Sequence, residues 1–191
     1  MKSSVGNFLP KRPAAGALFF SLIIIMLMVS STSWANDQPQ RDDATHQGEC
    51  EPNDQQQSML SQVNEARSQA RQCGDQPFEA AEPLTWSCKL EAAAESHSKD
   101  MAENDYFSHT GPEGAGIEQR VGNQDYTWQA VGENIAAGHT SVSAVVAGWL
   151  DSPGHCRNIM NGAFTEMGMA KAADPESRYS TYWTQTFGNP R

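Results

Sequence analysis

The stretch Val131–Asn161, VGENIAAGHTSVSAVVAGWLDSPGHCRNIMN, decides how this chain is organised. An apolar pattern of helical period fills its middle, with Glu133 before the pattern and His155 after it. Two unlike polar groups therefore bracket one helix. Gly132 and Gly154 each stand directly before one of them, and glycine is used where the backbone bends sharply or approaches something closely. The pattern favours a functional site over a solvated acid and an ordinary histidine.

The bracketed helix has clear boundaries. Ser141 or Ser143 is a suitable N-cap, and Pro153 ends the helix. Its apolar face consists of Val142, Val145, Val146, Trp149 and Leu150. Residues 158–161 then read as a turn.

The first 35 residues have the pattern of a secretory signal peptide. Lys2, Lys11 and Arg12 precede an apolar run over 17–29, which is short for a membrane span of about 20 residues. A small-x-small cleavage site follows, so we expect cleavage after Ala35 and a soluble protein in the periplasm or outside the cell. No cysteine lies at the junction, so we expect no lipid anchor and no stable membrane anchor after cleavage.

The charge of the remaining chain excludes some partners. Its 156 residues keep ten of the thirteen basic side chains and all twenty-three acidic ones, a formal charge of −13. Nucleic acid is therefore excluded as a partner, because phosphate binding needs concentrated Lys and Arg. The length fits one domain with a real core, and we expect a monomer.

Four cysteines, an even number in an exported chain, predict two disulfides. Cys50, Cys73, Cys88 and Cys156 allow three connectivities, and cysteine arithmetic alone does not choose among them.

The segment before the bracketed helix divides into a polar leader and two helices. Residues 36–53 are polar without apolar period and read as a flexible leader. Helical periodicity then predicts helices over 55–72, with Asp54 as N-cap and Gly74 beyond its end, and over 87–104. His97 lies on the apolar face of the second helix, where a histidine is typically a hydrogen-bonded core residue.

A loop and a strand connect the second helix to Glu133. Tyr106 and Phe107 anchor the loop in the core and hold His109 in a fixed place before a Gly-Pro turn. A short helical turn is expected over 117–121, and residues 126–135 read as a strand that leads into Glu133.

Two strands close the chain. Residues 165–172 and 179–188 flank a hairpin loop at 174–177, and both are at least half-buried by their composition. Helices followed by a small antiparallel sheet with a helix interposed predict an α+β fold in layers.

These motifs together resemble the CAP superfamily of cysteine-rich secretory proteins, antigen 5 and pathogenesis-related proteins, in its bacterial secreted branch. The resemblance covers about 60–188 and makes 54–191 a single CAP or SCP domain. The matching motifs are His97, 106–110 (YFSHT), 132–135 (GENI), Trp149 with 152–155 (SPGH), and 182–185 (YWTQ).

The resemblance implies a three-layer α-β-α sandwich with a central antiparallel sheet and a cavity lined by two histidines and two acids. His109 and His155 match the histidines, and Glu133 matches the first acid. The second acid is where this sequence departs, since Asp151 and Ser152 stand where relatives carry glutamate. The resemblance also implies the disulfide Cys73–Cys156, which leaves Cys50 and Cys88 as the second pair.

Imidazoles and a carboxylate suit a divalent transition metal such as Zn²⁺ better than Ca²⁺, which prefers six or more oxygens. We therefore expect His109, His155 and Glu133 to converge in one cavity and bind metal weakly, without a requirement for folding. Binding should fade as the pH falls through the imidazole range near about 6.5.

Two functions compete. The first is a binding module whose cavity holds a divalent metal, a small apolar ligand such as a sterol or lipid, or a protein partner, as the resemblance implies. The second is a secreted protease or esterase that uses His109, Glu133 and His155 with Ser108 or Ser152 as nucleophile. The absence of a Gly-x-Ser-x-Gly motif from the sequence favours binding.

Overall fold

A mixed sheet of six strands organises the molecule, and its strand order is β1-β6-β8-β7-β5, with β2 also paired to β6. The computed structural model describes residues 2–5, 9–10 and 50–191. The sheet strands are β1 (Lys2–Val5), β2 (Leu9–Pro10), β5 (Thr85–Trp86), β6 (Trp128–Ala137), β7 (Glu166–Ala173) and β8 (Thr181–Pro190). A separate hairpin consists of β3 (Arg71–Cys73) and β4 (Gln76–Phe78).

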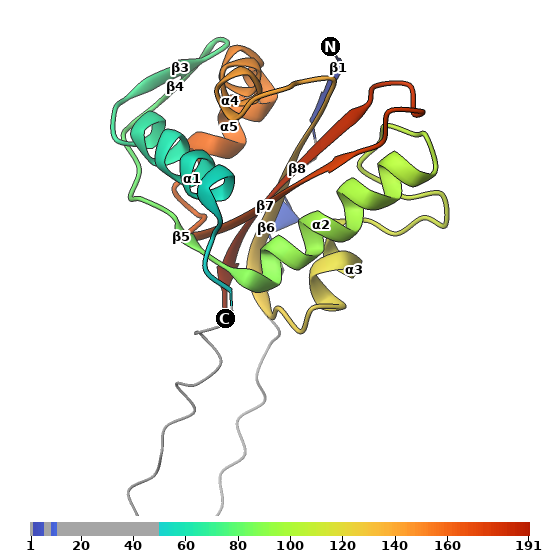
Figure 1. Ribbon diagram of the computed structural model, residues 1–191. Helices are drawn as coiled ribbons and strands as arrows, with labels where there is room; N and C mark the ends of the chain where they lie inside the picture. The colour runs from blue at the N-terminus through green and yellow to red at the C-terminus, as the bar shows by residue number, and fades with distance from the viewer. Residues whose placement is uncertain (1, 6–8, 11–49) are drawn as a thin grey trace, which may run out of the picture. The chain divides into compact units, whose positions relative to one another are not determined.

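Helices cover both faces of this sheet (Figure 1). Helices α1 (Asp54–Arg67), α4 (Val142–Asp151) and α5 (Pro153–Met160) pack together on one face, over a core that includes Met59, Trp149 and Phe187. Helices α2 (Cys88–Glu103) and α3 (Ile117–Gly122) lie on the other face, against β6, β7 and β8. The predicted α+β sandwich of three layers is confirmed, except that β5 pairs with β7 in parallel.

Helix α1 differs from the predicted helix at both ends. Asn53, not Asp54, is the N-cap, because its side chain accepts from the backbone N–H of Gln56 while the Gln56 side chain accepts from Asn53 N–H. The helix ends at Arg67 instead of continuing to 72, and the chain turns into the β3–β4 hairpin with Gly74 at φ 65°. Tertiary pairing of the hairpin here overrides helical periodicity.

Helix α5 is a second correction. The sequence predicted that Pro153 ends the preceding helix and that residues 158–161 form a turn, whereas a new helix begins at Pro153, with proline in its first turn, and runs to Met160. Proline lacks an N–H and has a fixed φ, so it is as suitable for starting a helix as for ending one. Helix α4 has the expected cap, since Ser141 Oγ accepts from Ala144 N–H at 3.2 Å.

The remaining helices and strands lie close to their predicted ranges. Helix α2 matches 87–104, α3 confirms the short helical turn at 117–121, and β7 and β8 form the expected hairpin. The strand predicted over 126–135 lies at 128–137, with a register shift between Trp128 and Ala130. Strands β4 and β5 fall between the two predicted helices, where no strand was expected.

Arg67 fastens α1 to the turn that follows α5, although no carboxylate of the described residues forms a salt bridge with it. Its guanidinium is fully buried and donates to the carbonyls of Ile159, Asn161, Phe164 and Glu82 at 2.7, 3.0, 3.2 and 2.8 Å. Burial lowers the pKa of Arg67 to about 10. Four carbonyls replace the water that this cation loses, which is how a buried polar group is retained.

The predicted export signal, 1–35, lies outside the described residues except for Lys2–Val5 and Leu9–Pro10, and the predicted leader, 36–53, is described only from Cys50 onward. Within the described part of the chain, no helix is long and apolar enough to cross a bilayer.

Candidate functional site

Glu133 lies in the middle of β6, and strand alternation sends its side chain to the face covered by α2 and α3. Val131 and Ile135 pack on that same face, whereas Ala130 and Ala136 belong to the core on the α4–α5 face. Gly132 is required by packing, because a Cβ at this position would meet the ring of Phe164 at 2.6 Å. The glycine lets β6 and Phe164 approach each other on the face of the sheet opposite the carboxylate.

The Glu133 carboxylate is buried and bound on both oxygens. Arg120 Nη2 donates to Oε2 at 2.6 Å, and His109 Nδ1 donates to Oε1 at 2.7 Å, while Glu133 itself is 2% exposed. Burial alone would raise the pKa of Glu133, but the hydrogen bond from His109 and the charge of Arg120 outweigh it and hold that pKa below its ordinary value. Glu133 is therefore a charged acceptor in the interior.

Arg120, on α3, holds the loop that carries His109. Besides Glu133, its guanidinium donates to the backbone carbonyl of His109 at 3.1 Å and to that of Ala115 at 2.8 Å. Sequence reasoning missed Arg120, because an arginine in a six-residue helix gives no sign that it will meet a carboxylate on a distant strand.

His97, on α2, borders the same carboxylate. Its Nε2 lies 2.9 Å from the carbonyl oxygen of Ser108 and 3.8 Å from Glu133 Oε1. A carbonyl only accepts, so Nε2 carries the proton, and burial lowers the pKa of His97 to about 4. His97 is thus neutral near pH 7, as expected of a hydrogen-bonded core histidine.

One ring nitrogen of His109 forms a hydrogen bond, and the other has no partner among the described residues. Its Nδ1–H donates to Glu133, which leaves the lone pair on Nε2, and Nε2 has no hydrogen-bond partner among the described residues. The side chain is 18% exposed, although the Nε2 atom itself is buried. A histidine whose other nitrogen donates to a carboxylate is the usual arrangement of a metal ligand or a general base.

A cavity of about 420 Å³ lies beside this cluster, between α2 and α3. His97 and Arg120 contribute to its wall, together with Ser96, Lys99, Asp100, Glu103, Ala115 and Asn123. Most of these side chains are polar or charged.

His155 is fully buried on α5, and its backbone is tied to β6 by amide side chains. Asn134 Nδ2 donates to the carbonyl oxygen of His155 at 3.3 Å and to Gln185 Oε1 at 3.1 Å. Asn158 Nδ2 donates to Asn134 Oδ1 at 2.9 Å and to the carbonyl of Glu133 at 3.0 Å. The structure thus joins His155 to the Glu133 strand through its main chain.

The candidate second acid is not part of the buried cluster. Asp151 is exposed at the end of α4, and Ser152 is half-buried where α5 begins. Across the described ranges, no group of three or more His, Cys, Asp and Glu side chains is placed to hold a metal ion. The contact that the structure does provide is the pair His109 and Glu133, with Arg120 and His97 around it.

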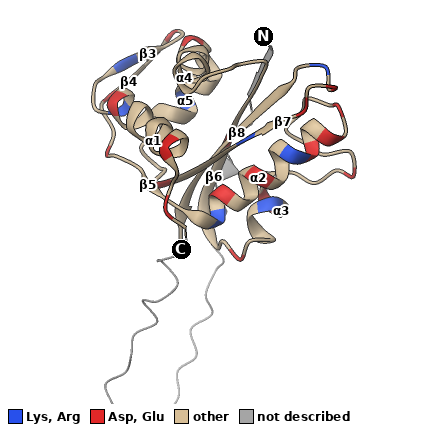
Figure 2. Ribbon diagram, viewed as in Figure 1, with Lys and Arg blue, Asp and Glu red and all other residues tan. Residues whose placement is uncertain are grey.

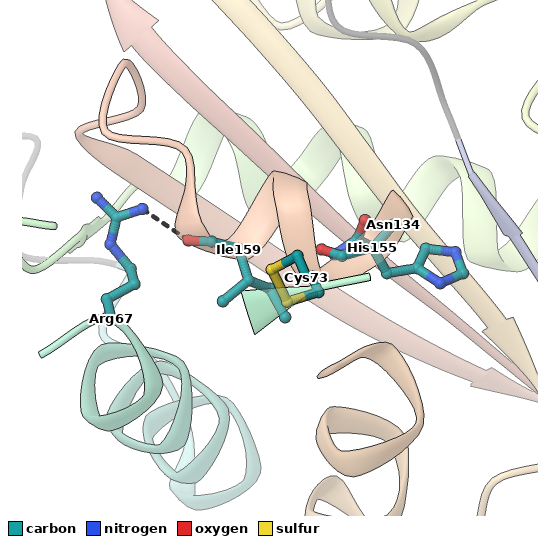
Figure 3. Close-up of a disulfide and its surroundings, with 6 residues drawn as sticks. Arg67, Cys73, Asn134, His155 and Ile159 are labelled. Atoms are coloured by element: carbon teal, nitrogen blue, oxygen red, sulfur yellow. Dashed lines mark hydrogen bonds between the residues drawn. A yellow bond between two sulfur atoms is a disulfide. The ribbon is translucent and has the colours of Figure 1, made fainter. Parts of the chain in front are cut away.

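The disulfide Cys73–Cys156 is confirmed, with a Cα–Cα distance of 5.5 Å (Figure 3). It joins the β3–β4 hairpin to α5, directly beside His155, whose ring points away from the sulfur atoms. Cys50 and Cys88 are also disulfide-bonded, in agreement with the second predicted pair. The residue after His155 is therefore anchored covalently as well as by packing.

Comparison with known proteins identifies the family that shares this fold and these motifs. The profile of the cysteine-rich secretory protein family, CAP, matches residues 60–187. Two Bacillus subtilis proteins, the uncharacterized membrane protein YlbC and the uncharacterized protein YkwD, are 35% and 31% identical over 104 and 105 residues. These alignments cover 54% and 55% of this chain but only 28% and 39% of the relatives, so the chain spans well under half their length.

Solved structures agree. An extracellular SCP-domain protein of Bacillus anthracis is 32% identical with a TM-score of 0.58, over 71% of this chain and 40% of that one. An outer surface protein of Borrelia burgdorferi shares the fold at 21% identity and a TM-score of 0.58, over 71% of this chain and 92% of that one. On the family match over most of its length, this chain belongs to the cysteine-rich secretory protein (CAP) family.

Proposed function

We propose that this protein is a secreted, non-enzymatic binding domain in which His109, oriented by Glu133, offers Nε2 to a ligand. A weakly bound divalent transition metal such as Zn²⁺ is the ligand that this nitrogen suits best. The observation that carries the proposal is the 2.7 Å hydrogen bond from His109 Nδ1 to Glu133, with Nε2 lacking a hydrogen-bond partner among the described residues.

The donor set fits such a metal only in part, which sets the expected affinity. Both oxygens of Glu133 are engaged by Arg120 and His109, so Glu133 serves better as the carboxylate that orients a ligand than as a ligand itself. His155, the other predicted nitrogen ligand, lies on α5, on the opposite face of the sheet from the Glu133 carboxylate, so water would have to complete the coordination at His109. A metal held by one imidazole and water binds far more weakly than one at a structural zinc site.

The polar wall of the cavity beside the cluster favours a polar ligand there over a sterol or lipid. A small apolar ligand or a protein partner remains part of the proposal for other surfaces of the domain. The extracellular homologue of Bacillus anthracis supports action outside the cytoplasm.

Binding is favoured over hydrolysis because no described serine meets His109 Nε2. Ser108 Oγ accepts from the backbone N–H of Thr110 at 3.1 Å, and Ser152 begins a helix on the opposite face of the sheet from the Glu133 carboxylate. A nucleophile, a base and an orienting acid are therefore not assembled in the way that acyl transfer requires.

Calorimetric titration with Zn²⁺ tests the proposal. Wild type should release or absorb measurable heat at pH 7.5, and His109→Ala should reduce the affinity about tenfold or more, whereas His155→Ala, on the other face of the sheet, should change it less than about twofold. His46→Ala, which changes a histidine outside the described residues, is the matched control and should retain wild-type binding. Equal heats from all four proteins would contradict the metal site.

A further inference from the structure

The outer edge of β6 carries a short strand-like segment of the chain itself (Figure 1). β1 pairs with it antiparallel, from Lys2 opposite Ala137 to Val5 opposite Asn134, and β2 continues with Leu9 opposite Val131 and Pro10 opposite Ala130. The other edge of β6 is occupied by β8 along its whole length. Without β1 and β2, β6 would therefore be the last strand on this side of the sheet.

That covering segment lies inside the predicted export signal. Once residues 1–35 are removed, the backbone N–H and C=O groups on the outer edge between Ala130 and Ala137 lose their strand partner among the described residues. An open edge of this length is a template for another strand, and proteins use such edges to bind extended peptides through main-chain hydrogen bonds.

We infer that, in the exported protein, this edge of β6 docks an extended peptide segment of another polypeptide, in antiparallel register, as Lys2–Val5 and Leu9–Pro10 do here. The segment is flanked by basic residues, as the chain's own Lys2, Lys11 and Arg12 flank that stretch. The exported part of the chain is strongly acidic, and Figure 2 shows acidic residues on α1, α2 and the surrounding loops, so a basic segment is attracted and an acidic one repelled.

The docked peptide lies next to the candidate site without depending on it. Val5 pairs opposite Asn134, the neighbour of Glu133, and α5, which carries His155, packs against β1. The main-chain contacts require neither a metal nor His109, so this inference stands or falls separately from zinc binding.

The test uses the exported protein, purified from culture with its N-terminus sequenced, and a fluorescent peptide with the sequence 2–11, KSSVGNFLPK. Fluorescence anisotropy should show saturable binding, and the full-length chain, whose edge is already occupied, should bind the peptide at least about tenfold more weakly. Hydrogen exchange should show new protection of amides in β6 when the peptide binds. No binding at about 1 mM, or equal binding by both forms, would overturn the inference.

N-methylation distinguishes strand addition from side-chain recognition. One peptide carries an N-methyl group at residue 4, and a second carries N-methyl groups at residues 3 and 5, because alternate amides of a strand point to opposite sides. One set should weaken binding about tenfold or more, and the other should change it less than about twofold. Equal effects of the two sets would refute strand addition.

A chelator separates this surface from the metal site. Peptide binding should be unchanged in EDTA, so a failure of zinc binding alone would count against the proposed function and leave the edge intact. Loss of peptide binding in EDTA would place the peptide on the metal site and overturn the edge assignment.

Discussion

His109 donates from Nδ1 to Glu133 Oε1 at 2.7 Å, and Arg120 holds the other oxygen of the same carboxylate at 2.6 Å. The Glu133 carboxylate therefore determines which nitrogen of His109 carries the proton, and it also binds Arg120 near the end of α3. Because Nδ1 carries the proton, the lone pair of His109 lies on Nε2, a buried atom without a hydrogen-bond partner among the described residues.

Replacing Glu133 with Gln should weaken zinc binding about tenfold to a hundredfold, because the amide oxygen still accepts from His109 but adds no negative charge to the pair. Calorimetry at pH 7.5, with circular dichroism to show that the variant is folded, measures the effect. Wild-type affinity in the folded variant would show that Glu133 does not orient the ligand.

The ion pair between Arg120 and Glu133 should show strong coupling in unfolding experiments. Removing one partner leaves a buried charge without its counter-ion, so Arg120→Met and Glu133→Gln should each cost about 3–5 kcal/mol of unfolding free energy. The double variant should cost clearly less than the sum of the two. Lys99→Met breaks the exposed pair of Lys99 with Glu95 and should leave the urea midpoint unchanged. Additive losses in the double variant would contradict the coupling.

His97 should make the protein less stable as the pH falls from about 6.5 to about 4. Burial lowers its pKa in the folded state to about 4, so the unfolded chain binds a proton more readily throughout this window and gains stability relative to the fold. The total effect is about 3 kcal/mol. Urea unfolding at several pH values should give a flatter profile for His97→Gln than for wild type.

His139, whose pKa burial also lowers, contributes to the same decline and remains in both proteins, so the comparison isolates His97. An unchanged slope in His97→Gln would contradict the prediction.

Arg67→Met should destabilise the fold by about 3 kcal/mol or more, since the carbonyl oxygens of Glu82, Ile159, Asn161 and Phe164 lose the donor that Arg67 supplies. Arg157→Met, at an exposed position of α5, is the matched control and should remain within about 0.5 kcal/mol of wild type. Thermal and urea unfolding measure both. Similar small losses in the two variants would show that the Arg67 contacts add little.

Gly168→Ala should cost about 3 kcal/mol, because a Cβ on β7 would clash with backbone atoms of Leu90 and Glu91 on α2, and backbone cannot move aside as a flexible side chain can. Gly162→Ala, where nothing lies within 4 Å of the new atom, should change stability by less than about 0.5 kcal/mol. Equal melting temperatures for the two variants would contradict this close packing of helix and strand.

Local pattern was sufficient for much of the fold. The spacing of Val142, Val145, Val146 and Trp149 predicted the position of α4, because a helix that buries one face repeats apolar residues with a period of about 3.6 residues. Alternation over 179–188 and the loop at 174–177 placed the β7–β8 hairpin for the corresponding reason. The motif resemblance placed Cys73 with Cys156, a pairing that cysteine arithmetic left open.

Other features depended on partners that are distant in the sequence. Residues 68–73 leave the helical pattern because β3 pairs with β4 and Cys73 meets Cys156, and neither contact is visible in a local window. Pro153 was predicted to end the preceding helix because that effect of proline is local. The helix that begins at Pro153 is stabilised by packing against α4 and β6, which a local window does not show.

The sequence by itself determined that His109 and Glu133 belong to one site, through motifs that match the family, and that the chain is acidic with two disulfides. Only the tertiary structure decided what Glu133 does there. Arg120 comes from α3 and His97 from α2, and both reach the carboxylate because the sheet brings a strand under two helices that precede it in the chain. A charge in the interior must find its partners in three dimensions, and periodicity along one segment carries no information about which distant side chains those will be.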